Sequence, residues 1–199
     1  ALAQDKKAVT ILAGVGIPVA CFLHGYAGFI FGSVKANALW MSPLMPVIFI
    51  MSAVVSGIAL CMLTYIAIME WRKFRAALAK GKDSAQPPAG VPLEEVIGKA
   101  SRYLIGFLVA AISLELLDLI FRGYTAMKSW DILRSVLYHK DFVTIFVLQY
   151  GVGNLLPFIL LVLPRLTIRR TVVALLLILY VVFMMRWNVV IGGQAFSLS

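Results

Sequence analysis

Charged residues are scarce in this chain: Asp, Glu, Lys and Arg make up 14% of its 199 residues, whereas hydrophobic residues make up 62%. Soluble domains usually carry about 25% charged and about 45–50% apolar residues. A soluble fold of this size would therefore have too little polar surface to cover its apolar core. The composition excludes an ordinary soluble globular domain and indicates helices that face lipid.

Residues that bind metals are equally few, because the chain has only two cysteines and two histidines. Cys21 and Cys61 lie far apart in apolar stretches, so no CxxC pair exists for zinc or an iron–sulfur cluster. A haem held between two spans needs two intramembrane histidines, and His139 lies outside the apolar stretches. We expect no metal site, haem or iron–sulfur cluster in this chain.

Negative charge is scarcer than positive charge, which leaves a net charge of +9. A nucleic-acid-binding surface would gather these basic residues on one solvated face, with aromatic residues between them. Here they stand at the ends of apolar stretches instead. We expect a lipid bilayer, and no nucleic acid, as the partner of this chain.

Long hydrophobic runs are present, and five of them reach the roughly 20 residues that a helix needs to cross a bilayer. The runs are continuous and do not alternate at every second residue, so they predict helices and not barrel strands. They cover Ala8–Phe31, Met45–Met69, Tyr103–Phe121, Phe142–Pro164 and Thr171–Ile191. We therefore predict an all-α, polytopic transmembrane bundle over residues 1–199, located in the inner (cytoplasmic) membrane.

Two connections between these spans carry patterns of their own. Residues 80–92 form a Gly/Pro/Ser-rich linker, and the acidic pair Glu94-Glu95 just after it predicts a short helix leading into the third span. Residues 125–140 place Trp130 and other apolar residues at helical spacing, which favours an outer helix lying in the membrane interface over a plain loop.

Lys and Arg are divided unevenly between the two sides of the predicted bundle. Twelve of the eighteen belong to the N-terminus, the second connection with its flanks, and the fourth connection, and six belong to the opposite side. Cytoplasmic loops carry an excess of Lys and Arg. The division predicts a cytoplasmic N-terminus and an outer C-terminus.

Ionisable residues inside a membrane are costly, by about 2.5–3.5 kcal/mol on insertion scales, so each calls for a partner or a function. Four lie in the outer half of the predicted spans, with Arg122 at a span edge. They are His24, Glu115, Asp118 and Arg186. Glu115, Asp118 and Arg122 share one helix face. These residues predict either a proton path or a buried ion pair in which Arg186 or Arg122 neutralises a carboxylate.

Uncharged polar groups add two further candidates. Gln149, Tyr150 and Asn154 stand among glycines before Pro157, which suggests either a kinked helix lining a cavity or hydrogen bonds between packed helices. His24 could bind a ligand or relay a proton, or it could simply be bonded to a neighbouring carbonyl.

Three segments together resemble the NrfD/polysulfide-reductase membrane-subunit family, and within it the ten-helix branch that includes HybB and DsrP. They are Leu23-His24-Gly25 followed by Trp40 to Gly57, Gly151 to Pro157, and Arg186 to Gln194. The ending Gly192-Gly193-Gln194 favours DsrP. The resemblance implies that these five spans are the C-terminal part of a longer subunit.

The resemblance also implies a function. Such a subunit of a respiratory oxidoreductase exchanges electrons between menaquinone or ubiquinone and an outer, ferredoxin-like iron–sulfur subunit, with a cytochrome and further membrane subunits as possible neighbours. It implies that the N-terminal half holds most of the quinone site, and that His24 is the quinone-adjacent residue of this part. Two alternatives remain: a secondary transporter, and a passive membrane anchor for redox subunits.

Overall fold

The computed structural model describes residues 2–34, 40, 42–79, 93–125, 143–164 and 167–194. Its elements are α1 (Leu2–Ser33), α2 (Met45–Ala79), α3 (Leu93–Thr125), η1 (Val143–Leu155), α5 (Leu156–Val162), α6 (Ile168–Trp187) and η2 (Asn188–Gly192), of which η1 and η2 are π-helical. The linker expected at residues 80–92 lies outside the described residues, as does the outer helix expected at 125–140 apart from Thr125.

Five helices in the described part of the chain are long and apolar enough to cross a membrane, which confirms the predicted all-α bundle. They are Lys6–Ser33, Met45–Leu78, Leu93–Phe121, Ile145–Val162 and Ile168–Ile191. Two run further than the apolar runs indicated, because α2 continues past Met69 to Ala79 and α3 begins at Leu93. Ala, Leu, Glu, Lys and Arg in these extensions favour helix without being apolar enough to appear as a span. The short helix expected to lead into the third span is the first part of α3.

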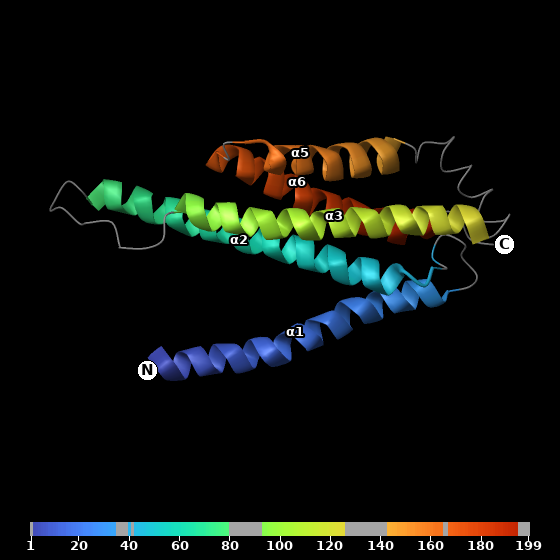
Figure 1. Cartoon of the computed structure of the whole chain (residues 1–199), viewed down its shortest axis with the longest axis horizontal. Helices are drawn as coiled ribbons and strands as arrows, with labels where there is room; N and C mark the ends of the chain where they lie inside the picture. The colour runs from blue at the N-terminus through green and yellow to red at the C-terminus, as the bar shows by residue number, and fades with distance from the viewer. Residues whose placement is uncertain are drawn as a thin grey trace.

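The hydrophobic core lies between α2, α3, α5 and α6, the four helices drawn above α1 in Figure 1. Its fully buried members include Ala59, Leu104, Leu108, Leu175 and Ile178. In contrast, α1 contributes no residue to this core, and its large side chains are exposed, with Phe22 at 79%. The exposed apolar surface of α1 is suited to lipid, as expected of a spanning helix.

Helix α1 packs closely against α2 only near the connection between them. A Cβ atom on Gly28 would lie 2.7 Å from the Met45 carbonyl oxygen, and one on Gly32 would lie 2.7 Å from the Ser42 carbonyl oxygen. Toward its N-terminus α1 diverges from α2 (Figure 1). Small residues therefore permit close approach at one end, and the divergence leaves hollows at the middle of the pair.

Pro157 accounts for the change of winding between η1 and α5. Proline has no N–H to donate and its ring crowds the carbonyl four residues earlier, so a regular α-helix cannot run through it undisturbed. The chain is π-helical up to Leu155 and α-helical from Leu156, with Pro157 in the first turn of α5. The irregular helix that the sequence suggests is therefore a π-to-α transition.

Candidate functional site

A hydrogen-bonded polar cluster joins α3 to both π-helical segments. Gln149 on η1 donates from Nε2 to Oε2 of Glu115 on α3, at 3.3 Å. Asn188, the first residue of η2, donates from Nδ2 to Oε1 of Gln149 at 2.8 Å. Gln149 is buried, with 6% of its surface exposed. Gln149 thus links the Glu115 carboxylate on α3 to Asn188 on η2.

Asn154 lies beside the same carboxylate, five residues after Gln149 on η1. It is 5% exposed and its side chain approaches Glu115. Its buried Nδ2 atom has no hydrogen-bond partner among the described residues. Tyr150 belongs to a different contact, since its ring packs against Phe146 with 6.0 Å between the centroids.

The second carboxylate of α3 has a partner that precedes α2. The hydroxyl of Ser42 donates to Oδ1 of Asp118, and the same hydroxyl oxygen accepts a hydrogen bond from the Leu44 N–H at 3.2 Å. Both Ser42 and Asp118 are buried. Asp118 therefore ties α3 to the connection between α1 and α2.

Arg186 is placed differently from either ion pair that the sequence suggests. Its guanidinium carbon lies 5.5 Å from the centre of the Phe49 ring, a cation–π contact. Among the described residues, no carboxylate oxygen lies within 4.0 Å of Arg186. Its Nε atom is buried without a hydrogen-bond partner. The backbone of Arg122 belongs to α3, and its side chain lies outside the described part of the chain.

His24 lines a separate open cavity of about 530 Å³ between α1 and α2, with Leu179 of α6 also on its wall. Its walls are otherwise small or apolar: Ile17, Ala20, Cys21, Ile50, Ala53, Val54, Ser56, Gly57 and Leu60. His24 Nδ1 lies 3.0 Å from the Ala20 carbonyl oxygen. That oxygen can only accept, so Nδ1 carries the proton and Nε2 of a neutral ring is left as an acceptor.

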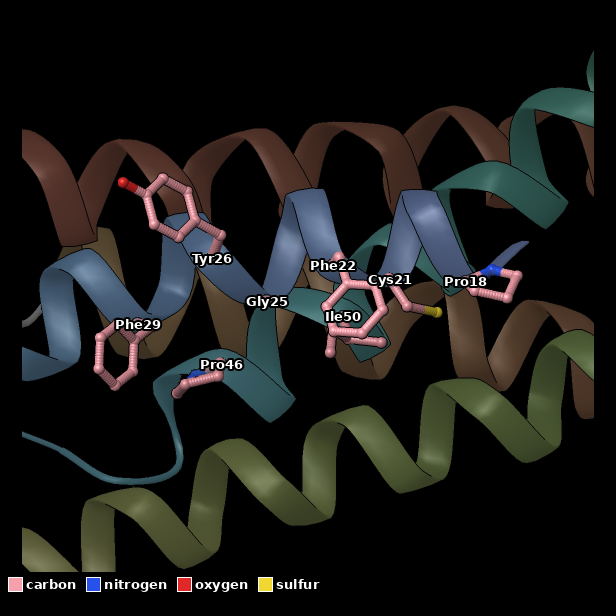
Figure 2. A pocket seen from close by; sticks show the side chains of 8 residues that line it. All are labelled: Pro18, Cys21, Phe22, Gly25, Tyr26, Phe29, Pro46 and Ile50. Carbon is pink, nitrogen blue, oxygen red and sulfur yellow. The ribbon is translucent and has the colours of Figure 1, made fainter. Parts of the chain in front are cut away.

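A second hollow of about 590 Å³ lies on the other flank of the α1–α2 pair and is almost wholly apolar. Figure 2 shows its lining residues, which are Pro18, Cys21, Phe22, Gly25, Tyr26, Phe29, Pro46 and Ile50. Cys21 and Ile50 border both hollows. The two flanks thus differ in chemistry, because one of them carries the imidazole of His24.

Comparison with known protein families identifies the family to which this chain belongs. The model of the family described as polysulphide reductase, NrfD, matches residues 1–198. The chain belongs to the NrfD polysulphide reductase family. This NrfD chain is therefore a multi-pass membrane protein both by its helices and by its family.

Two curated proteins are similar to the NrfD chain. A selenate reductase subunit of Mesobacillus selenatarsenatis is 39% identical over 95 residues, which are 48% of this chain and 21% of that protein. A putative dimethyl sulfoxide reductase membrane subunit of Halobacterium salinarum is 28% identical over 170 residues, 85% of this chain and 35% of that protein. The chain thus spans about a fifth and about a third of the lengths of these relatives. No solved structure matches it.

Some of the candidate site residues of the NrfD chain lie close together in the structure, and others lie apart. Glu115 meets Gln149 and Asn154, whereas His24 stands apart from them because α2 lies between α1 and α3 (Figure 1). In the part of the chain that the structure describes, no group of three or more His, Cys, Asp or Glu side chains could hold a metal ion.

Three residues that contact the candidate site residues were not predicted from the sequence. They are Ser42, Phe49 and Asn188. Ser42 and Asn188 are polar residues within or beside apolar runs, which is the only signal that could have indicated them.

Proposed function

We propose that this chain is part of an integral membrane subunit of a respiratory oxidoreductase. In this proposal the subunit exchanges electrons between the quinone pool and an iron–sulfur subunit on the outer side of the inner membrane. The observation that carries it is the apolar cavity between α1 and α2, with a single imidazole on its wall, in a chain of the NrfD family. The names of the two relatives, both subunits of reductases, support it.

The chemistry of this cavity fits menaquinone or ubiquinone. A quinone has an apolar isoprenoid tail and a ring with two oxygens, so it needs an apolar channel with one or a few polar groups. The walls supply the first, and His24 Nε2 supplies a hydrogen-bonding atom. In its hydroxyl form the ring can donate to Nε2, which makes His24 a binding residue and a candidate proton acceptor.

Other parts of the proposal rest on the resemblance and stay predictions. They are the HybB/DsrP-like branch, a larger share of the quinone site in an N-terminal half, and an iron–sulfur partner with a cytochrome and further membrane subunits as neighbours. The small share of each relative that this chain spans leaves room for additional quinone-binding segments.

The test is His24→Phe in the assembled complex, measured as turnover with a soluble quinol analogue. We expect turnover to fall by about tenfold or more while the complex still assembles, because the imidazole on this cavity wall is gone. Tyr26→Phe is the matched control: it removes a polar atom from an exposed position on the same helix. Turnover that is unchanged in both variants would instead favour a passive anchor, and solute flux without quinone dependence would favour a transporter.

A further inference from the structure

The surroundings of Glu115 are unusual for a carboxylate at membrane depth. Among the described residues, Asp118, one turn along α3, lies beside it, while Arg186 belongs to α6. Arg186 forms no ion pair with either carboxylate and lies over Phe49 instead. Within the described part of the chain, Glu115 is therefore surrounded by amides and not by a cation.

Two opposing effects act on such a carboxylate. The hydrogen bond from Gln149 stabilises its ionised form, while the apolar membrane and the lack of a cation partner among the described residues oppose ionisation. The hydrogen bond from Gln149 is compatible with either protonation state. A proton bound at Oε1 leaves the hydrogen bond from Gln149 to Oε2 intact.

The π-helical winding of η1 is what brings two amides to Glu115. Five residues in an α-helix turn the chain by about 500°, which would place Gln149 and Asn154 about 140° apart around the axis. In a π-helix the backbone hydrogen bond joins residues five apart and the turn is wider, so these two residues lie much closer to a common face. Val143–Leu155 is π-helical over the whole interval. An α-helical η1 could present only one of them to α3.

The orientation of the Gln149 amide is also determined. Asn188 Nδ2 can only donate, so it selects Oε1 of Gln149 and leaves Nε2 directed at Glu115. Asn188 is the first residue of η2, the other π-helical segment. Each π-helical segment therefore contributes to the hydrogen bonding of this one carboxylate.

We propose that Glu115 is a proton-binding site whose carboxyl group is held by Gln149, with Asn154 beside it and with Asn188 as a positioning residue that orients Gln149. The ligand is a proton taken up and released by the carboxylate, so no redox partner is needed. The inference goes beyond the proposed electron exchange and does not depend on it. It also assigns different roles to Glu115 and Asp118, because the Asp118 carboxylate is bound to Ser42.

The test is infrared difference spectroscopy of the full chain in its complex, in lipid, between two pH values at which it stays folded. We expect a band from a protonated carboxyl group that is lost in Glu115→Gln and retained in Asp118→Asn. In Gln149→Leu the band should persist and move to higher frequency, because its carbonyl loses a hydrogen-bond donor. Asn188→Leu should move it in the same direction by less, since Gln149 remains but is no longer oriented.

Matched controls keep the result interpretable. Glu95→Gln alters an exposed glutamate of the same helix, paired with Lys99 at 2.8 Å, and should leave the band unchanged. If Glu115→Gln does not fold, Glu115→Asp should keep a band at an altered frequency. A spectrum without any band that depends on Glu115 would overturn the proton site, and a frequency insensitive to Gln149→Leu would overturn the positioning. Neither readout uses quinone, so a failure of the proposed function leaves this inference standing.

Discussion

The indole N–H of Trp40 donates a hydrogen bond to the main-chain carbonyl oxygen of Val189, with 2.5 Å between the two heavy atoms. Trp40 lies in the connection between α1 and α2, and Val189 lies in η2, 149 residues further along the chain. Gly193 lies against the same indole, where any Cβ atom would overlap the ring. One side chain thus joins the first helical pair to the end of the last span.

Trp40→Phe is expected to lower the free energy of unfolding by about 1–3 kcal/mol, because it leaves a carbonyl without its donor. The edge contact with Phe31, at 5.3 Å between ring centres, should survive the change. Trp71→Phe is the control, since Trp71 is 58% exposed, and its effect should stay within about 0.5 kcal/mol. Reversible unfolding in mixed micelles measures both. Equal losses would show that the indole hydrogen bond contributes nothing.

Gly28→Ala should destabilise the α1–α2 pair by about 1–3 kcal/mol, because its methyl group would lie 2.7 Å from the Met45 carbonyl oxygen and from Pro46 Cα. Gly14→Ala, on the same helix, meets nothing within 4 Å and should be neutral or slightly stabilising. Changes of opposite sign in the unfolding free energies of the two variants would show that the effect at Gly28 comes from packing and not from helix propensity. The same unfolding measurement applies, and a stabilising Gly28→Ala would contradict the close approach.

The hydrogen bond between Ser42 and Asp118 should appear as energetic coupling. Ser42→Ala leaves a buried carboxylate without its hydroxyl donor, for which we expect a loss of about 1.5–3 kcal/mol. Asp118→Asn should reduce the further effect of Ser42→Ala, since a neutral amide depends less on that donor. A double-mutant cycle of unfolding free energies measures the coupling. Strict additivity would show that the two side chains do not interact in the membrane.

Arg186 should couple to Phe49 more strongly than to either carboxylate. The cation–π contact predicts a coupling of about 0.5–2 kcal/mol in a cycle of Arg186→Leu with Phe49→Leu. The corresponding cycle with Glu115→Gln should give a smaller value, because the described part of the chain contains no direct ion pair there. A larger coupling to Glu115 would restore the buried ion pair that the charge pattern suggests.

Orientation in the membrane can be checked with single cysteines in a background of Cys21→Ser and Cys61→Ser. Leu78→Cys, near the end of α2, should react with an impermeant reagent from the cytoplasmic side, and Tyr124→Cys, near the end of α3, from the outside. Both positions are exposed, at 69% and 92%. The expectation follows from the uneven division of Lys and Arg. Labelling of Leu78→Cys from outside only would invert the predicted topology.

The spans could be predicted from sequence because crossing a bilayer is a requirement on local composition. Continuous apolar runs are sufficient to locate such helices, and the beginning of α3 follows from Glu94 and Glu95 just after a proline. The polar extension of α2 beyond Met69 was not predicted by that reasoning. Hydropathy reports what can enter lipid and is insensitive to where a helix stops.

The candidate site was predictable only in part, for a different physical reason. Glu115 and Gln149 stand out individually, because polar groups in apolar runs are costly. Their contact depends on the π-helical winding of η1 and on the position of Asn188, 39 residues further on. Arg186 illustrates the same limit: charge alone suggested a carboxylate partner, whereas packing places it on an aromatic ring.

Helix α2 stands between α1 and α3, so the imidazole of His24 and the carboxylate of Glu115 share no described hydrogen-bond partner. Free-energy changes at sites without common partners usually add. Substitutions at the two positions should therefore combine without epistasis, and a variant selected for one property can be carried into a background altered in the other.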